Sequence, residues 1–391
     1  MHQTSDLPSR VQAWLQSRQT EMLAFLQKLV LIQSGSRNTA GLDRMADAIA
    51  AAMPAPMTLQ TLTFPDHGNM LMAKTPAAQA GEKQLLVLGH TDTVFPADTA
   101  FNFYREDEEK AYGPGVIDMK GGLVCGVFAL SALAHLGLLE QIPVCMFFNS
   151  DEEIGSPASW DVICREADNS FAAFVLECGG KENEIVTGRK GKSGYRLEVQ
   201  GQSGHAAQAG QDKPSAILEL AHKVIALETL NDPPRVSLNV GLVKGGIGPN
   251  TVAGHAEARI DIRFTGEADD RRVKAAMDQI VGAPAIPGVT CTLAYETGRP
   301  PMPQTSANEG LFEMVQQQAE RLGQIVRSEF RHGVSDANVV ASRGVPVLDG
   351  MGPLGDLDHS EQEYMLKASL VPRTCLLALS IWHCSRSAGT P

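Results

Sequence analysis

The stretch LLVLGHTDTV, residues 85–94, runs from an apolar segment into a histidine and an aspartate. An apolar run of this length is typical of a buried strand. Residues i and i+2 of a strand point to the same face, so the side chains of His90 and Asp92 should emerge together where the strand ends. Such a pair is either a metal ligand with its supporting acid or, more commonly, two surface or core residues. The rest of the chain has to decide between these interpretations.

The chain has 391 residues, a length at which two domains are expected. Its net charge of -12 disfavours nucleic acid or an anionic membrane surface as a partner. No signal peptide is predicted, and no membrane span, because no stretch approaches about 18 uninterrupted apolar residues. The 7 cysteines include no CxxC pair, a pattern typical of reduced thiols in a cytoplasmic protein.

Apolar strands are expected to alternate with helices along the first half of the chain. Strands are expected at 57–64, 69–74, 85–90, 143–148 and 172–176, and an apolar helix at 123–136. This alternation predicts an α/β fold with a mostly parallel sheet and flanking helices. Ligands in such sheets bind beyond the carboxyl ends of the strands, and polar clusters follow several of these segments.

The pattern changes between about residues 190 and 300. The expected elements there are a strand (194–201), a helix (214–230), two strands (235–242 and 256–264), a helix (268–281) and a strand (289–295). This βαββαβ order is typical of a ferredoxin-like α+β domain. Beyond it, a helix (308–322), a short strand (345–350) and a closing helix (366–383) return to the first domain. The predicted domains are therefore 1–189, an inserted 190–300, and 301–391.

Seven polar residues stand at predicted strand ends or near the C-terminus: His90, Asp92, Asp118, Glu152, Glu153, Glu177 and His359. Burying so many carboxylates together is unfavourable unless cations are present. Two histidines with carboxylates suit zinc, with cobalt or manganese as alternatives. Two metals that activate a water also need a carboxylate that is not a ligand to take its proton, and the adjacent Glu152 and Glu153 can divide these roles.

Each of these motifs also has an ordinary structural interpretation. The run Asp151-Glu152-Glu153 is commonly a solvated loop, and the glycines around Asp118 serve in tight turns. His359 alone could be a capping or surface histidine. Their joint occurrence, in order, at predicted strand ends favours the metal site.

Several motifs together resemble the aminoacylase and glutamate carboxypeptidase family of dizinc metallopeptidases, especially its bacterial glutamate carboxypeptidase branch. They are HTDTV (90–94), GPGVIDMKGG (113–122), DEEIGS (151–156), Glu177, SGHA (203–206) and DHSEQEY (358–364). The resemblance runs from about residue 85 to 366. It implies a dizinc peptidase core, formed by 1–189 and 301–391, and an inserted domain used for dimerisation.

The resemblance also implies roles for the polar residues. One zinc would be held by His90, Asp118 and Glu177, and the other by Asp118, Glu153 and His359, with Asp118 bridging. Asp92 would orient His90. Glu152 would be the general base and then the acid toward the leaving amine.

Three residues of the inserted domain resemble the family's substrate contacts. His205 would reach across a dimer to polarise the scissile carbonyl. Arg263 would bind the free carboxylate of the substrate, for which a planar bidentate donor is suited, with Asn250 as its amide partner. In one departure, Glu184 stands where the glutamate-specific branch is expected to have a lysine, so glutamate preference is not predicted.

The resulting hypothesis is a homodimeric, cytoplasmic dizinc hydrolase that cleaves the amide bond next to a residue with a free carboxylate. Its substrate would be a small peptide or an N-acyl amino acid, making it a carboxypeptidase or a deacylase. One alternative is a non-catalytic zinc-dependent binding or scaffold protein; retention of Glu152 argues against it. The other alternative is a dinuclear dipeptidase or aminopeptidase. Arg263 argues against it, because an arginine would bind a free carboxylate of the substrate.

Overall fold

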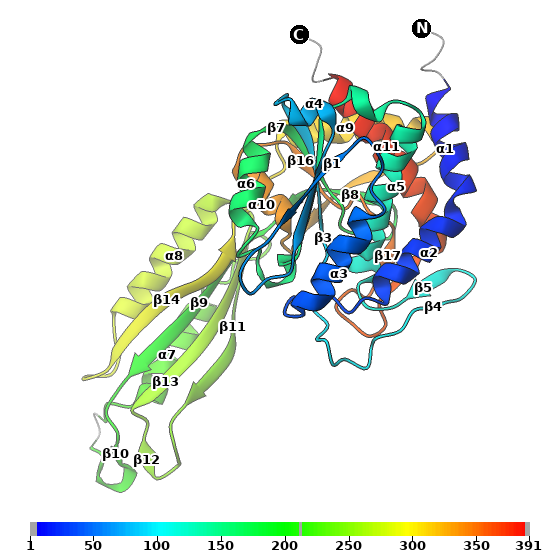
Figure 1. Ribbon diagram of the computed structural model, residues 1–391. Coiled ribbons are helices and arrows are strands. Elements are labelled where there is room, and N and C mark those ends of the chain that lie inside the picture. Colours follow the sequence, from blue (N-terminus) through cyan, green and yellow to red (C-terminus); the bar gives the residue numbers. More distant parts are fainter. Residues whose placement is uncertain (1–5, 211–212, 388–391) are drawn as a thin grey trace. The chain divides into compact units, whose positions relative to one another are not determined.

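The computed structural model describes residues 6–210 and 213–387, and the chain divides into two compact units (Figure 1). Unit 1 comprises Met1–Gly188, Gln304–Phe330 and Ser335–Pro391. Unit 2 comprises Arg189–Pro303 and the short segment Arg331–Val334.

Unit 1 is built on a six-stranded sheet with the order β1-β2-β6-β3-β7-β16. Its strands are β1 (Thr58–Leu62), β2 (Met70–Lys74), β3 (Gln84–His90), β6 (Val144–Asn149), β7 (Ser170–Val175) and β16 (Val347–Leu348). The last four are parallel, whereas β1 and β2 are antiparallel to their neighbours. Every residue of β3 and β6 is buried, as expected of parallel strands covered on both faces. The mostly parallel α/β sheet predicted from the sequence is confirmed.

Helices flank this sheet (Figure 1). They are α1 (Leu7–Ser17), α2 (Gln19–Val30), α3 (Thr39–Ala50), α4 (Pro76–Gln79), α5 (Gly121–His135), α6 (Trp160–Asp168), α9 (Ser306–Arg321), α10 (Asp336–Ser342) and α11 (Lys367–Ser387). The apolar α5 packs against α11 and β3. Among the described residues, Val116–His135 is long and apolar enough to cross a membrane, but 83% of its most apolar stretch is buried inside the protein. Its composition is that of a core helix.

Shorter strands complete unit 1. A second sheet has the order β17-β18-β5-β4 and contains β4 (Arg105–Glu106), β5 (Lys110–Tyr112), β17 (Gly355–Asp356) and β18 (Tyr364–Leu366). It joins the segment before Asp118 to the segment after His359. A separate pair is formed by β8 (Glu184–Arg189) and β15 (Arg327–Arg331). All 7 cysteines are free.

Unit 2 has the βαββαβ order that the sequence predicts. Its main elements are β9 (Gly191–Gln200), α7 (Ala216–Glu228), β11 (Val236–Gly245), β13 (His255–Phe264), α8 (Glu267–Gly282) and β14 (Thr290–Arg299). The antiparallel sheet order β11-β13-β9-β14 is the ferredoxin-like one. Ile260 of β13, Leu220 of α7 and Met277 of α8 belong to one core, so both helices cover the same face of the sheet. A two-stranded ribbon, β10 (Gly204–His205) with β12 (Thr251–Val252), extends from this unit (Figure 1).

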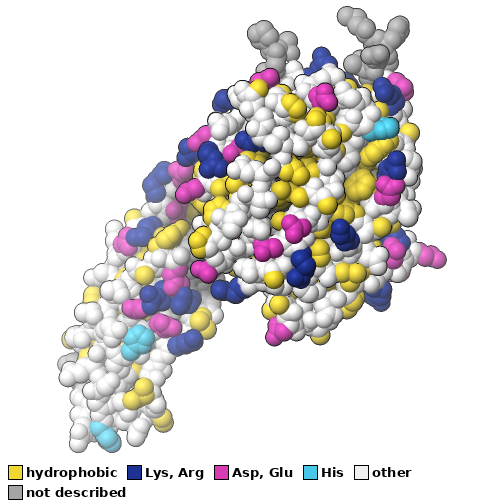
Figure 2. Space-filling view, viewed as in Figure 1, with side chains coloured by type: hydrophobic (Ala, Val, Ile, Leu, Met, Phe, Trp, Pro, Cys, Tyr) yellow, Lys and Arg dark blue, Asp and Glu magenta, His cyan; other side chains and the backbone are white. Residues whose placement is uncertain are grey.

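The outer face of α8 is solvated and charged. Arg271 pairs with Glu267, and Lys274 pairs with Asp278, each at i,i+4 spacing. Figure 2 shows basic and acidic side chains mixed over this part of unit 2. Such pairs contribute only a few tenths of a kcal/mol each, so the helix is held mainly by its buried face.

We predict that Gly122→Ala destabilises the protein. A Cβ at Gly122 of α5 would lie 1.9 Å from the carbonyl oxygen of Leu176, which is backbone and cannot swing aside. We expect a loss of about 1–3 kcal/mol in the free energy of unfolding, measured with urea. The matched control is Gly310→Ala in α9, where a Cβ meets no atom within 4 Å and should stabilise by about 0.5–1 kcal/mol. Equal stability of the two variants would contradict the packing argument.

Candidate metal centre

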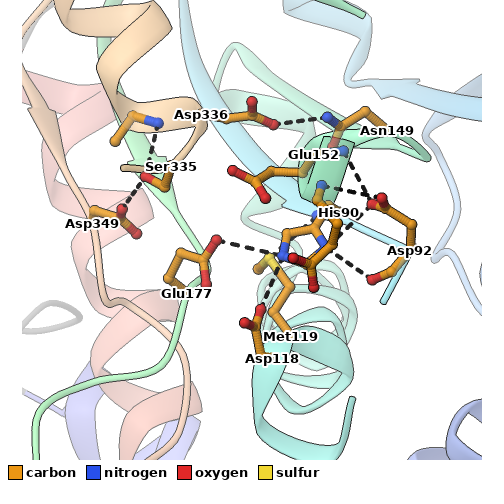
Figure 3. Close-up of polar contacts among 12 residues, drawn as sticks. His90, Asp92, Asp118, Met119, Asn149, Glu152, Glu177, Ser335, Asp336 and Asp349 are labelled. Atoms are coloured by element: carbon orange, nitrogen blue, oxygen red, sulfur yellow. Dashed lines mark hydrogen bonds and ion pairs between the residues drawn. The ribbon is translucent and has the colours of Figure 1, made fainter. Parts of the chain in front are cut away.

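His90 is the last residue of β3, and its imidazole lies among a group of carboxylates. Its Nε2 is 3.1 Å from Asp118 Oδ1 and 3.4 Å from Glu177 Oε1. Asp118 belongs to the turn before α5, and Glu177 follows β7, the parallel neighbour of β3. Figure 3 shows the three side chains pointing toward one another. Each offers a ligand atom, and these atoms all lie within 4.8 Å of one another, a spacing suited to one metal ion.

A second group shares the Asp118 carboxylate. Asp118 Oδ2 is 3.1 Å from Nε2 of His359, and the same nitrogen is 3.3 Å from Glu153 Oε2. The other oxygen of Glu153 is buried and has no hydrogen-bond partner among the described residues. His359 has φ 60°, an uncommon left-handed conformation for a residue other than glycine. Asp358 also offers a carboxylate oxygen that lies within 4.8 Å of a ligand atom of Asp118 and of one of His359.

Asp92 supports both His90 and the acidic pair. His90 Nδ1 is 3.0 Å from the backbone oxygen of Asp92 and 3.4 Å from its carboxylate. The carboxylate accepts hydrogen bonds from the backbone N–H groups of Glu152 and Glu153, each at 3.1 Å, and from Ser36 Oγ at 2.8 Å. One buried residue therefore holds both the histidine ring and the turn that carries the two glutamates.

Protonation in this cluster reflects crowded negative charge. Burial lowers the pKa of His90, but its hydrogen bonds to Asp118, Asp92 and Glu177 outweigh burial and raise it well above the usual value. Hydrogen bonds to Asp118 and Glu153 raise the pKa of His359 to about 11. Burial raises the pKa of Glu153 to about 7.

Asp118 behaves in the opposite way. Burial raises the pKa of this carboxyl, but its bonds to His359 and His90 outweigh that effect and lower it. The carboxylate therefore stays charged between two imidazoles. Together with the unpartnered oxygen of Glu153, this mixed nitrogen and oxygen donor set fits divalent cations such as zinc.

Glu152 lies beside the cluster in the short helical turn Glu152–Ile154. In Figure 3 its side chain points away from Asp92, toward the side of the site on which Glu177 lies. Figure 3 also shows two neighbouring contacts, in which Asn149 Nδ2 donates to Asp336 Oδ2 at 2.7 Å and Ser335 Oγ donates to Asp349 Oδ2 at 2.6 Å. Buried hydrogen bonds of this kind restrict the motion of the side chains that make them.

Unit 2 carries the three predicted substrate contacts, at its two ends. His205 is exposed on β10, paired with Thr251, and Ala206 N–H donates to the backbone oxygen of Asn250 at 2.9 Å. The structure thus brings His205 and Asn250 together. Arg263 lies toward the opposite end of β13, about 26 Å along the strand from His255, which borders that ribbon.

Arg263 and Glu184 both form hydrogen bonds with residues close to them in the sequence. Arg263 Nε donates to Asp261 Oδ1 at 2.8 Å on its own strand. Glu184 accepts from the backbone N–H of Glu182 at 2.8 Å and so stays within its own turn.

Sequence reasoning missed three residues of this centre. Ser36 has no signal in the sequence, because it meets Asp92 only through folding. Asp358 adjoins His359, and that adjacency could have marked it. Glu363 lies within the motif DHSEQEY, and its carboxylate accepts backbone N–H groups from the turn that bears Asp118.

Comparisons with known proteins identify the same kind of enzyme as the sequence motifs do, a metallopeptidase. The model of the peptidase family M20/M25/M40 matches residues 86–383. Carboxypeptidase G2 of Pseudomonas sp. (strain RS-16) is 25% identical over 372 residues, which cover 92% of this chain and 88% of that protein.

Solved structures share the fold at low sequence identity. An M20 family metallo-carboxypeptidase from Sulfolobus solfataricus has a TM-score of 0.73 at 16% identity, covering 93% of this chain and 98% of that one. The aminopeptidase PepT of Bacillus cereus has a TM-score of 0.72 at 20% identity, with the same coverage of 93% and 98%. The family resemblance predicted from the sequence is confirmed. The chain belongs to the peptidase family M20/M25/M40 and is a metal-dependent peptide hydrolase.

Proposed function

We propose that this protein is a dizinc hydrolase that cleaves the amide bond next to a residue with a free carboxylate. The observation that carries the proposal is the position of Asp118, whose two oxygens each lie 3.1 Å from a different imidazole, one of His90 and one of His359. A carboxylate placed in this way can bridge two ions.

Each ion would have one histidine and two carboxylates. His90, Asp118 and Glu177 would hold the first, and Asp118, Glu153 and His359 the second. Zinc suits this donor set, with cobalt or manganese as alternatives. When bound, the two ions supply water activation and stabilise charge on the attacked carbonyl.

Glu152 is the residue of this chain that moves the proton. Its neighbour Glu153 lies 3.3 Å from His359 and would be a ligand of the second ion, so the role of base falls to Glu152, as the family resemblance implies. It would take a proton from the attacking water and deliver it to the nitrogen of the leaving amine. Asp92 holds both backbone N–H groups and thereby sets where the two carboxylates point.

Arg263 supports recognition of a carboxylate. Among the described residues, its hydrogen bonds go to Asp261, through Nε and Nη2, and its side chain is 27% exposed. A guanidinium oriented in this way can present its remaining N–H groups to a substrate anion. This favours a carboxypeptidase or an N-acyl-amino-acid deacylase over an aminopeptidase, which must bind a free amine. Glutamate specificity is not proposed, since Glu184 is acidic and bonded locally.

We further propose a homodimer formed through unit 2. Large apolar side chains are exposed on α7 and on the edge strand β11: Ile217, Leu218, Ile225, Leu242 and Val243. An edge strand beside an apolar helix face is suited to contact with a second copy of the same surface. A second copy would also bring His205 and Asn250 from one protomer to a site of the other. The seven free thiols support a cytoplasmic location.

We predict opposite effects for substitutions at the adjacent glutamates. Glu152→Gln should retain both metals and lose turnover by about 10²–10⁴-fold, because it removes a base and no ligand. Glu153→Gln should bind less metal, because it removes a ligand oxygen. Metal content and kcat are measured on the same preparations. A Glu152→Gln enzyme with normal turnover would exclude Glu152 as the base.

Substitution of Arg263 should affect only substrates with a free carboxylate. For Arg263→Ala we expect KM to rise on the order of 10–100-fold, since a hydrogen bond to a charged group contributes about 1.5–3 kcal/mol. With the corresponding amidated substrate the change should disappear. Arg259→Ala, on the same strand and paired with Glu296, is the matched control and should leave both KM values unchanged.

Hybrid dimers test whether His205 acts on the partner's site. A His205→Ala protomer paired with a Glu152→Gln protomer should have about half the activity of wild type, because one of two sites receives an intact histidine and an intact base. The inverse control places both substitutions in one protomer beside a wild-type partner, and this hybrid should be inactive. The reverse pair of results would show that His205 serves its own protomer.

A further inference from the structure

Glu363 is a buried carboxylate that serves the backbone of the Asp118 turn. Its Oε1 accepts from the N–H groups of Ile117 at 2.8 Å and Asp118 at 3.0 Å, and its Oε2 accepts from the N–H of Gly115 at 3.0 Å. The residue has no exposed surface. Three backbone donors therefore converge on one side chain.

Strand pairing places Glu363 at this turn. β18 pairs with β5 so that Tyr364 lies opposite Tyr112, and Glu363 comes next to the point where the chain leaves β5. The turn then passes through Gly115 with φ 72°, a conformation that favours glycine. A Cβ at Gly115 would lie 2.6 Å from Thr93 Cγ2, so the turn packs closely against Thr93.

The chemistry of this contact calls for a carboxylate. A glutamine carries one acceptor oxygen and one NH₂ donor, so it could accept from Ile117 and Asp118 but would set two donors against each other at Gly115. Only a carboxylate accepts all three bonds.

Glu363 also belongs to the loop that bears His359. Its own N–H donates to Ser360 O at 3.1 Å, and the N–H of Ser360 donates to Leu357 O at 3.2 Å. The side chain of Glu363 is thus a direct link between this loop and the backbone of the Asp118 turn. Its position sets how Asp118 Oδ2 meets His359.

We propose that Glu363 is a positioning residue that holds the Asp118 carboxylate in register between His90 and His359, and so sets the affinity of the centre for its metals. The inference rests on the proposed function, in which Asp118 bridges two ions. It assigns to Glu363 no contact with substrate or metal.

The test uses the full-length protein with Glu363→Gln and Glu363→Ala. Glu166→Gln is the matched control, because Glu166 is a buried carboxylate of the same unit that accepts from Lys74 and Gln84. Backbone amide exchange is measured on metal-free protein, and Zn²⁺ affinity by titration calorimetry with a competing chelator. Thermal unfolding of the metal-free forms reports general stability.

Wild type should show slow exchange at Gly115, Ile117 and Asp118. Glu363→Gln should lose protection at Gly115 alone, and Glu363→Ala at all three residues. Zn²⁺ affinity should fall by about 10–100-fold in the alanine variant, the range for groups that orient metal ligands, and by less in the glutamine variant. Glu166→Gln should bind Zn²⁺ as wild type does.

Different results separate this inference from the proposed function. Wild-type protein that binds no Zn²⁺ would refute the dizinc site, whereas wild-type affinity in both Glu363 variants would overturn the positioning role alone. An equal fall in Glu166→Gln would also overturn it, as a general stability effect. Should Glu363→Ala fail to fold, Glu363→Gln decides, and unchanged affinity despite lost protection at Gly115 rejects the inference.

Discussion

The site depends on a single shared carboxylate, that of Asp118, which lies between imidazoles from two distant parts of the chain. Oδ1 faces His90 and Oδ2 faces His359. Glu153 and Glu177 stand close by, so the buried negative charge is larger than the two histidines can balance without protons or cations. The raised pKa values of both histidines express this imbalance, and a pair of divalent cations would relieve it.

The fold of unit 1 supplies the order needed for this arrangement. β3, β6 and β7 are parallel neighbours, so the residues that follow them gather at one edge of the sheet. Hydrogen bonds to backbone N–H groups then hold the turns that carry Asp118, Glu152 and Glu153. The carboxylate of Asp92 accepts hydrogen bonds from the backbone N–H groups of both glutamates. That of Glu363 accepts them from the turn that contains Asp118. Two acidic side chains, those of Asp92 and Glu363, thus hold the backbone next to the acidic side chains that are proposed as ligands.

Unit 2 shows how far a family resemblance alone can be taken. The resemblance groups His205, Asn250 and Arg263 as substrate contacts. The structure joins the first two through the ribbon of β10 and β12, but leaves Arg263 toward the opposite end of β13. Residues at opposite ends of one unit cannot contact the same small substrate over such a length. In the proposed dimer, His205 and Asn250 of one copy would instead serve a site of the other.

The sequence by itself determined the parallel core, the βαββαβ order of unit 2 and the residue types at the strand ends, because these follow from local hydrophobic periodicity and from motifs of contiguous residues. Only the tertiary structure decided that Asp118 divides its oxygens between His90 and His359, that Ser36 meets Asp92, and that Glu363 gathers the N–H groups of the Asp118 turn. Glu363 and Gly115 are 248 positions apart and meet because β18 pairs with β5. Hydrogen bonds of that kind arise from the pairing of strands far apart in the chain, which no local pattern in the sequence encodes.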